Sequence, residues 1–419
     1  MNNKTKLFNK NFTLMIIGQI ISIFGNSILR FALPLYLLDT TNSAALFGAV
    51  SACSLIPMIA VTPFGGIIAD RANKRNIMVF LDFLTALLII VFTLSIGKFN
   101  LVFMLIVTLM ALYGIQGAYQ PTVQASIPLL VDKENLLPGN AIINQVNSLA
   151  GLLGPIIGGI CYGFYGLKPI LIASIICFFI SAVMEIFITI PYTKRETKAS
   201  AISIVKEDFK TSISFIFKDK PVIFKTIIII SFFNLFLTSM IIIGIPVIIT
   251  KILNMPSQAY GITQGMLAFG GLCGGIMTGV LVNKIKIYHS HIILLMAVLA
   301  LIPMGFVLMI GAFPMISYIV ITACCFFIML TSTMFSIQIL TFIQSETPNM
   351  LIGKVISFCL AMTMCSQPIG QIMYGYLFEI LKGNPHVIVF GTALICSVIA
   401  ITSKKVFNSM REKNLIILS

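Results

Sequence analysis

Residues 65–75 read GGIIADRANKR, a glycine pair followed by one acid and three cations. This charged stretch separates two apolar runs, 44–69 and 76–97, and each run is long enough to cross a bilayer as a helix. A short charged turn between two such runs is typical of a chain that crosses the membrane repeatedly. The stretch therefore predicts a fold built from membrane-spanning helices.

The composition of the whole chain supports this fold class. Of its 419 residues, 58% are hydrophobic and only 10% are charged, whereas soluble domains carry about 25% charged residues. The apolar runs are continuous, while strands of a membrane β-barrel are about 10 residues long and alternate in polarity. We therefore predict an all-α membrane protein.

The net charge of +14 would suggest nucleic-acid binding in a soluble protein. In a membrane chain it indicates the positive-inside rule and attraction to anionic lipid. We expect the lipid bilayer as a partner and no nucleic acid. The nine cysteines and three histidines show no metal-ligand spacing, so we expect neither a metal nor a cofactor.

The apolar runs predict twelve spans and three parts of the chain. These parts are an N-terminal six-helix half at 1–191, a linker with an amphipathic helix at 192–221 and a C-terminal six-helix half at 222–419. The predicted spans are 12–38, 44–69, 76–97, 100–125, 138–163, 168–191, 222–251, 257–283, 290–311, 313–344, 351–380 and 385–404.

The 27 lysines and arginines are distributed unevenly between the two sides of these spans. Most of them lie in the two termini, the 192–221 linker and the loops on the same side. The positive-inside rule therefore predicts a multi-pass cell-membrane protein with both termini in the cytoplasm.

The two predicted halves carry matching motifs at nearly the same separation, which indicates an internal repeat. The matching pairs are Ala32-Leu33-Pro34 with Gly244-Ile245-Pro246, Gly66–Arg71 with Gly279–Lys284, and Pro155 with Pro368. Parallel six-helix repeats are a design of alternating-access transporters. We therefore predict two pseudo-symmetric halves around a central cavity.

The opening stretch lies at the cytoplasmic end of the second predicted span. Its glycines allow close helix approach, and Asp70 can pair with the next turn's cations or with a helix N-terminus. We predict a conformational gate here; the alternative is a basic loop that only sets topology. The predicted gating residues are Gly65, Gly66, Asp70, Arg71, Lys74 and Arg75.

Polar side chains recur at helical spacing in four predicted spans. Amides are costly against lipid, so these polar faces are expected to point inward. They line a substrate cavity, or alternatively form hydrogen bonds between helices; Arg30 alternatively has a structural or interfacial role. The predicted cavity residues are Gln19, Ser22, Asn26, Arg30, Tyr113, Gln116, Gln120, Asn144, Asn147, Gln367 and Gln371.

Few acids lie within the predicted spans. Asp82, Glu185 and Glu379 are the candidates for proton coupling, because a carboxyl group in a low-dielectric environment can exchange protons near neutral pH. The alternatives are that Asp82 pairs with the basic stretch at 71–75, that Glu185 reaches the membrane interface, and that Glu379 lies at a span boundary.

The fifth predicted span carries the close-packing face Gly151, Gly154, Pro155, Gly158 and Gly159. With these motifs in hand, the chain resembles the major facilitator superfamily over nearly its whole length. Residues 65–75 look like that superfamily's loop 2–3 signature, with Asn73 where glycine is usual; asparagine tolerates the left-handed conformation. Residues 154–159, GPIIGG, look like the antiporter signature of drug/proton exporters. Residues 18–22, 32–36 and 128–131 are similar to macrolide-efflux-type and siderophore-exporter-type members.

The resemblance implies export of a drug-like small molecule in exchange for protons by a monomer. Two positions depart from the pattern: Tyr113 stands where exporters place an arginine, and Asn26 where many relatives carry an acid. Both positions usually serve proton coupling in those exporters.

We weigh three function classes. The leading hypothesis is a secondary transporter that exports lipophilic or amphipathic compounds on the proton gradient. The alternative is uptake or facilitated transport of an anionic or zwitterionic metabolite, which Arg30 favours. A receptor or scaffold would not explain polar faces on several spans. The sequence shows no nucleophile–base set and no Walker motif, so we expect neither an enzyme nor a protein that drives transport with ATP itself.

Overall fold

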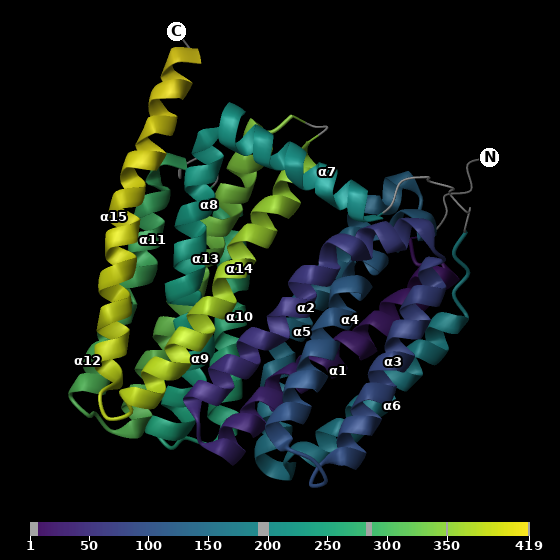
Figure 1. Ribbon diagram of the computed structural model, residues 1–419, viewed down its shortest axis with the longest axis horizontal. Helices are drawn as coiled ribbons and strands as arrows, with labels where there is room; N and C mark the ends of the chain where they lie inside the picture. The colour runs from purple at the N-terminus through teal and green to yellow at the C-terminus, as the bar shows by residue number, and fades with distance from the viewer. Residues whose placement is uncertain (1–6, 192–200, 282–286, 349–350, 418–419) are drawn as a thin grey trace. The chain divides into compact units, whose positions relative to one another are not determined.

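The computed structural model describes residues 7–191, 201–281, 287–348 and 351–417. Within these ranges the regular elements are helices and no strand occurs (Figure 1). The prediction of an all-α membrane fold with two pseudo-symmetric halves is therefore confirmed. Eleven helical spans of the described chain are long and apolar enough to cross a membrane.

Six long helices form the N-terminal half. Their bounds are α1 (Lys10–Thr41), α2 (Ala44–Arg71), α3 (Lys74–Ser95), α4 (Leu101–Leu130), α5 (Leu136–Tyr165) and α6 (Leu167–Ile186). A short turn η1 (Lys133–Asn135) precedes α5. The amphipathic linker helix is α7 (Ala201–Ser214), and it continues into the π-helical segment η2 (Phe215–Asp219).

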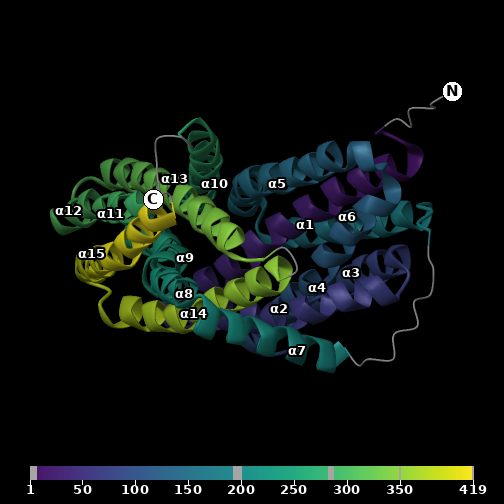
Figure 2. The same cartoon turned by 90° about the horizontal axis from the view of Figure 1, so that it is seen from above.

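The C-terminal half is more segmented. Its elements are α8 (Pro221–Phe233), η3 (Asn234–Thr238), α9 (Ser239–Pro246), η4 (Val247–Ile252), α10 (Ser257–Val280), η5 (Ile287–His289), α11 (Ser290–Leu299), α12 (Leu301–Met309), α13 (Pro314–Glu346), α14 (Ile352–Ile380) and α15 (Pro385–Ile417). Here α10 packs along α13, and α11 packs against α15 (Figures 1 and 2).

The predicted eighth span is not among the eleven apolar ones. It forms α10, whose sequence is rich in glycine and polar residues and is therefore less apolar than its neighbours. Close packing accounts for two of the glycines of α10. A β-carbon on Gly270 or Gly274 would collide with the carbonyl oxygens of Phe326 and Leu330 on α13, so close packing selects glycine there.

The chain separates into two units by its internal contacts. The N-terminal unit comprises Met1–Thr41 and Cys53–Val205, and the C-terminal unit comprises Asn42–Ala52 and Lys206–Ser419. The first turns of α2 thus belong with the C-terminal unit. There Gly48 packs directly on the backbone of Gly375 in α14.

Small residues bring the helices of the N-terminal unit together. On α1, Gly18 faces Ser181 and Glu185 of α6. On α5, Gly154 faces Ser27 and Gly158 faces Phe31, both on α1. The glycine-rich face of α5 thus fixes the position of α1, the helix with the polar stripe.

Two local expectations differ from the structure. The sixth span ends at Ile186 rather than 191. Asn73 does not adopt the left-handed conformation. Its φ is −68°, and its side chain caps the start of α3 by accepting a hydrogen bond from the Arg75 N–H.

Four of the five described residues with positive φ occur at corresponding places in the two halves, and Gly166 (φ 71°) has no such counterpart. Asn42 (φ 51°) precedes α2, and Asn254 (φ 52°) precedes α10. Likewise, Gly97 (φ 83°) follows α3, and Gly311 (φ 61°) follows α12. These pairs extend the internal repeat from sequence motifs to backbone geometry.

Candidate functional site

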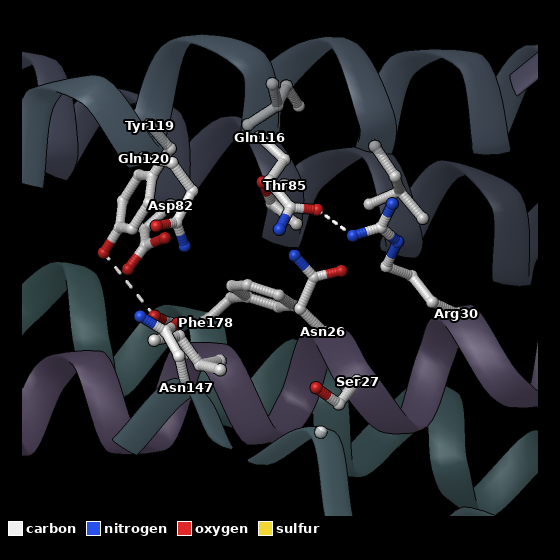
Figure 3. Close-up of a pocket in the computed structure, with 15 residues that line it drawn as sticks. Asn26, Ser27, Arg30, Asp82, Thr85, Gln116, Tyr119, Gln120, Asn147 and Phe178 are labelled. Carbon is white, nitrogen blue, oxygen red and sulfur yellow. Dashed lines mark hydrogen bonds between the residues drawn. The ribbon is translucent and has the colours of Figure 1, made fainter. Parts of the chain in front are cut away.

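A polar cavity of about 160 Å³ lies inside the N-terminal unit (Figure 3). Five helices contribute to its wall. The polar and small lining residues are Ser22, Asn26, Ser27 and Arg30 of α1, Asp82 and Thr85 of α3, Gln116, Tyr119 and Gln120 of α4, and Asn147 and Gly151 of α5; Phe178 of α6 adds an aromatic wall.

Helical spacing explains how α1 supplies one side of this wall. Ser22, Asn26 and Arg30 recur every four residues, so they lie on one face of the helix. Gly151 lines the cavity from α5, one turn from Gly154, which packs on α1. The predicted cavity face and the predicted antiporter motif therefore meet at the same place.

Arg30 forms one end of the cavity. Its guanidinium donates a hydrogen bond to Gln116 and lies 3.5 Å from the ring centroid of Tyr113. A cation over an aromatic ring is attracted to the ring's electron-rich face. Among the described residues no carboxylate forms an ion pair with Arg30. Gln116 is the one hydrogen-bond acceptor that the described part of the chain offers the Arg30 guanidinium.

The other end is acidic. Figure 3 shows Asp82 and Tyr119 at the opposite side of the view from Arg30, with Asn26 and Gln116 between them. Figure 3 shows the Asp82 carboxyl group beside the Tyr119 side chain, and both residues line the cavity. Only 2% of Asp82 is exposed, so this carboxyl group reaches the cavity but little bulk solvent.

Glu185 lies behind this wall and does not line the cavity. Tyr119 donates a hydrogen bond of 2.8 Å to Glu185 Oε1, and Gln19 Nε2 donates one of 2.6 Å to the Tyr119 hydroxyl. Gln19 and Glu185 are fully buried. Ser181, one turn before Glu185, donates to the Gly18 carbonyl and holds α6 against α1.

We name Gln19, Asp82, Tyr119, Ser181 and Glu185 the Tyr119 cluster. Three of its oxygens are buried without a hydrogen-bond partner in the described part of the chain: Gln19 Oε1, Asp82 Oδ2 and Glu185 Oε2. All three are acceptors. A buried acceptor without a donor costs about 1–3 kcal/mol. The described part of the cluster therefore has more acceptor atoms than hydrogen atoms to donate to them.

The other predicted cavity residues lie elsewhere. Asn144 is exposed and does not line the cavity. Gln367 and Gln371 belong to α14 in the C-terminal unit, where Gln371 is buried and its Oε1 has no partner among the described residues. Helical spacing gives the face of a residue but not which neighbour covers it.

The third proton-coupling candidate, Glu379, is also separate. Its Oε2 accepts hydrogen bonds from the Ala44 N–H at 2.8 Å and the Ser43 hydroxyl at 3.1 Å, and its Oε1 pairs with Lys382 at 2.6 Å. Carboxylates are stabilised at helix N-termini. Glu379 thus anchors the end of α14 to the first turn of α2.

The predicted gating stretch is described only in part. Gly65 packs on Gly117 of α4, where a β-carbon would lie 2.6 Å from the Gly117 carbonyl oxygen. Arg75 reaches Asn76 through its guanidinium. Arg71 and Lys74 are partly buried. The burial of Gly66 and the side chain of Asp70 lie outside what the structure describes, so the charged half of the predicted gate remains a prediction.

Sequence reasoning missed Tyr119, the centre of the buried cluster. Its signal was present, because Tyr119 follows Gln116 by three residues and therefore shares its helical face. Ser181 carries the same signal on α6, where it precedes Glu185 by one turn.

A bundle of long membrane helices around a buried polar cavity is the architecture of a membrane transport protein. The family model described as Major Facilitator Superfamily matches residues 15–371, so the chain belongs to the Major Facilitator Superfamily. The predicted family resemblance is confirmed.

Two relatives and one solved structure illustrate the similarity. Macrolide efflux protein A of Streptococcus pyogenes is 23% identical over 382 residues, covering 90% of this chain and 92% of that protein. The staphyloferrin A transporter of Staphylococcus aureus is 26% identical over 255 residues, covering 59% and 62%. The crystal structure of nucleoside transporter NupG (D323A mutant) shares the fold with a TM-score of 0.74 at 14% identity, covering 96% of this chain and 100% of that chain.

Proposed function

We propose that this transporter exports lipophilic or amphipathic compounds by proton antiport with alternating access. The observation that carries the proposal is the cavity of the N-terminal unit, which joins amide groups, a cation without a carboxylate partner among the described residues and a buried carboxyl group. A solute that presents both polar and apolar surface fits such a wall. The similarity to macrolide efflux proteins supports the export direction.

The proton gradient is the proposed energy source, with no cofactor. Asp82 and Glu185 are the proposed proton-binding groups, because both are buried acids without a neighbouring cation in the Tyr119 cluster. Glu379 is a weaker candidate, since Lys382 and the first turn of α2 already stabilise its charge.

A second function is favoured by Arg30. Its unused donors suit an anionic or zwitterionic metabolite, which the protein would take up or let equilibrate. In either case we propose a monomer in the cell membrane with both termini in the cytoplasm, as the lysine and arginine distribution indicates.

Flux into proteoliposomes separates these functions. The purified protein is reconstituted and a pH gradient is imposed, with a panel of radiolabelled macrolides, other drugs and carboxylate metabolites as probes. We expect accumulation of an amphipathic probe that stops when the gradient is collapsed. Counterflow of a metabolite without any response to the gradient would contradict proton antiport and support the second function.

A further inference from the structure

An apolar groove of about 480 Å³ lies in the C-terminal unit, lined by α8, η3 and α15. The α8 span and α15 contact each other and run in opposite directions (Figure 1). Ile229 of the groove is buried, whereas Phe232, Leu394 and Val398 are exposed. Exposed apolar surface of this kind marks a binding groove or a contact with the membrane. On helices that cross the membrane, such a groove suits hydrocarbon.

A lysine on each helix extends the groove at one end. Each lies 3, 7 and 11 residues from groove side chains of its own helix: Lys225 from Ile228, Phe232 and Phe236, and Lys405 from Thr402, Val398 and Leu394. Residues at these intervals share one face of a helix. Because the helices are antiparallel, the start of α8 and the end of α15 lie at the same end of the groove.

The charges of these two lysines are not balanced within the described protein. Both side chains are exposed, and neither forms an ion pair with a described acid. No aspartate or glutamate lies three or four residues from either lysine in the sequence. Lys220, one turn before Lys225, differs because it pairs with Glu346 at 2.6 Å. The two free ammonium groups are therefore available to an external anion.

The length of the groove matches one leaflet of a bilayer. The distance along the helix is 11 residues from Lys225 to Phe236 and again from Lys405 to Leu394, or about 16 Å at 1.5 Å per residue. Half of a hydrocarbon core is about 15 Å. Lysine stems cover apolar surface while their ammonium groups reach the headgroup level. A ligand that fits has an anionic end and a long hydrocarbon chain.

We propose that this groove binds an anionic phospholipid, with an acyl chain between α8 and α15 and the phosphate held by Lys225 and Lys405. A zwitterionic phospholipid fits less well, because its own cationic group competes with the lysines for the phosphate. A second copy of the chain also fits less well. A two-fold axis along the membrane normal would bring two pairs of lysines together. The lipid site is separate from the polar cavity, which lies in the N-terminal unit.

The chain contains no tryptophan, so one introduced tryptophan reports on its own surroundings. Phe232→Trp places this reporter in the groove. The full-length variant is reconstituted in phosphatidylcholine vesicles with a minor share of phosphatidylglycerol that carries brominated acyl chains, which quench indole fluorescence on contact. The same share of brominated phosphatidylcholine gives the quenching expected from bulk lipid. We expect at least a tenfold excess of phosphatidylglycerol at the groove over its bulk share.

Charge variants in this reporter protein test the headgroup contact. Lys225→Gln and Lys405→Gln should each lower the excess about fivefold, which corresponds to about 1 kcal/mol for a cation near a membrane surface. Lys404→Gln is the matched control. Lys404 is exposed and next to Lys405, but it lies about 100° round the helix from Lys405 and away from the groove. It should leave the excess unchanged.

Equal quenching by the two brominated lipids would overturn the inference, because the groove would then hold only bulk lipid. An equal loss in Lys404→Gln would also overturn it, since general surface charge would account for the excess. Quenching by neither lipid would show that protein covers the groove. Loss of the excess on adding glycerol phosphate would instead indicate a site for free phosphate. If Phe232→Trp fails to insert, Leu394→Trp provides the reporter from α15.

Discussion

Arg30 and Glu379 show that the role of a charged residue depends on how far its neighbours already satisfy it. Glu379 is charge-paired and hydrogen-bonded to the first turn of α2, so its interactions are satisfied within the protein. Arg30 has one hydrogen-bond partner among the described side chains and a tyrosine ring beneath it. Arg30 therefore has capacity left for a ligand, and Glu379 has little.

Arg30→Ala should weaken binding of acidic amphipathic probes at least tenfold, or about 1.4 kcal/mol. The reason is loss of a charged, multidentate donor inside a poorly solvated cavity. Binding of a probe panel to purified protein measures the change, with Lys404→Ala, an exposed cation of α15, as the control. Unchanged affinity for every probe would remove Arg30 from the site.

Glu379→Ala should lower the free energy of unfolding by about 1–2 kcal/mol, because the first turn of α2 loses a carboxylate that accepts its N–H groups. Thermal unfolding in detergent measures this effect. Lys382→Ala, which leaves those hydrogen bonds in place, should cost less. Proton-coupled flux should persist in both variants. Its loss in Glu379→Ala alone would indicate that Glu379 takes part in proton coupling.

At the scale of elements, α5 and α1 act as a pair. Gly154 and Gly158 let α1 approach closely, and α1 carries Ser22, Asn26 and Arg30 into the cavity. The span formed by α8, η3, α9 and η4 is different, because π-helical segments interrupt it at Asn234–Thr238 and Val247–Ile252. Such segments are frequent at functional sites, and here Asn234 donates to the Thr363 carbonyl of α14.

Gly154→Ala should reduce transport several-fold without preventing membrane insertion. The added methyl group would collide with Ser27 and displace α1, and overpacking of this kind costs about 1–3 kcal/mol. Flux per molecule of inserted protein is the measurement. Gly391→Ala on α15, where a β-carbon meets open space, is the control. Equal flux in the two variants would show that close α1–α5 packing is not needed.

The sequence predicted the elements better than their neighbours. Apolar runs located the spans because hydropathy is a property of each segment alone, and the spacing of Ser22, Asn26 and Arg30 predicted one wall of the cavity. The meeting of Asp82, Tyr119 and Glu185 depends on how α3, α4 and α6 pack, which no single segment encodes. Asn144 shares the expected spacing but does not line the described cavity.

At the scale of the whole molecule, the internal repeat joins two halves that differ in their polar content. The described cavity and the Tyr119 cluster both lie in the N-terminal unit. The acid of the 65–75 stretch is Asp70 in the first half, and Asn283 takes its place in the second. The charged half of the proposed gate therefore depends on one copy of the motif.

Asp70→Asn should lower transport strongly while expression and insertion stay normal, because the side chain loses the charge that pairs with cations or a helix N-terminus. Flux in proteoliposomes, corrected for protein content, measures this. Asp132→Asn, an exposed acid outside the motif, is the control. Normal transport by a well-expressed Asp70→Asn protein would exclude the gating role.

The paired left-handed residues limit which substitutions each half can accept. At Gly97 and Gly311 a β-carbon would meet open space, so backbone conformation alone restricts the residue type there. Asn42 and Asn254 take up the same conformation with a side chain that tolerates it. A complete substitution scan should therefore show the same narrow profile twice along the chain: glycine, asparagine and aspartate accepted, and valine, isoleucine and threonine rejected. Mutational tolerance would then reveal the internal repeat even at positions where the aligned residues of the two halves differ.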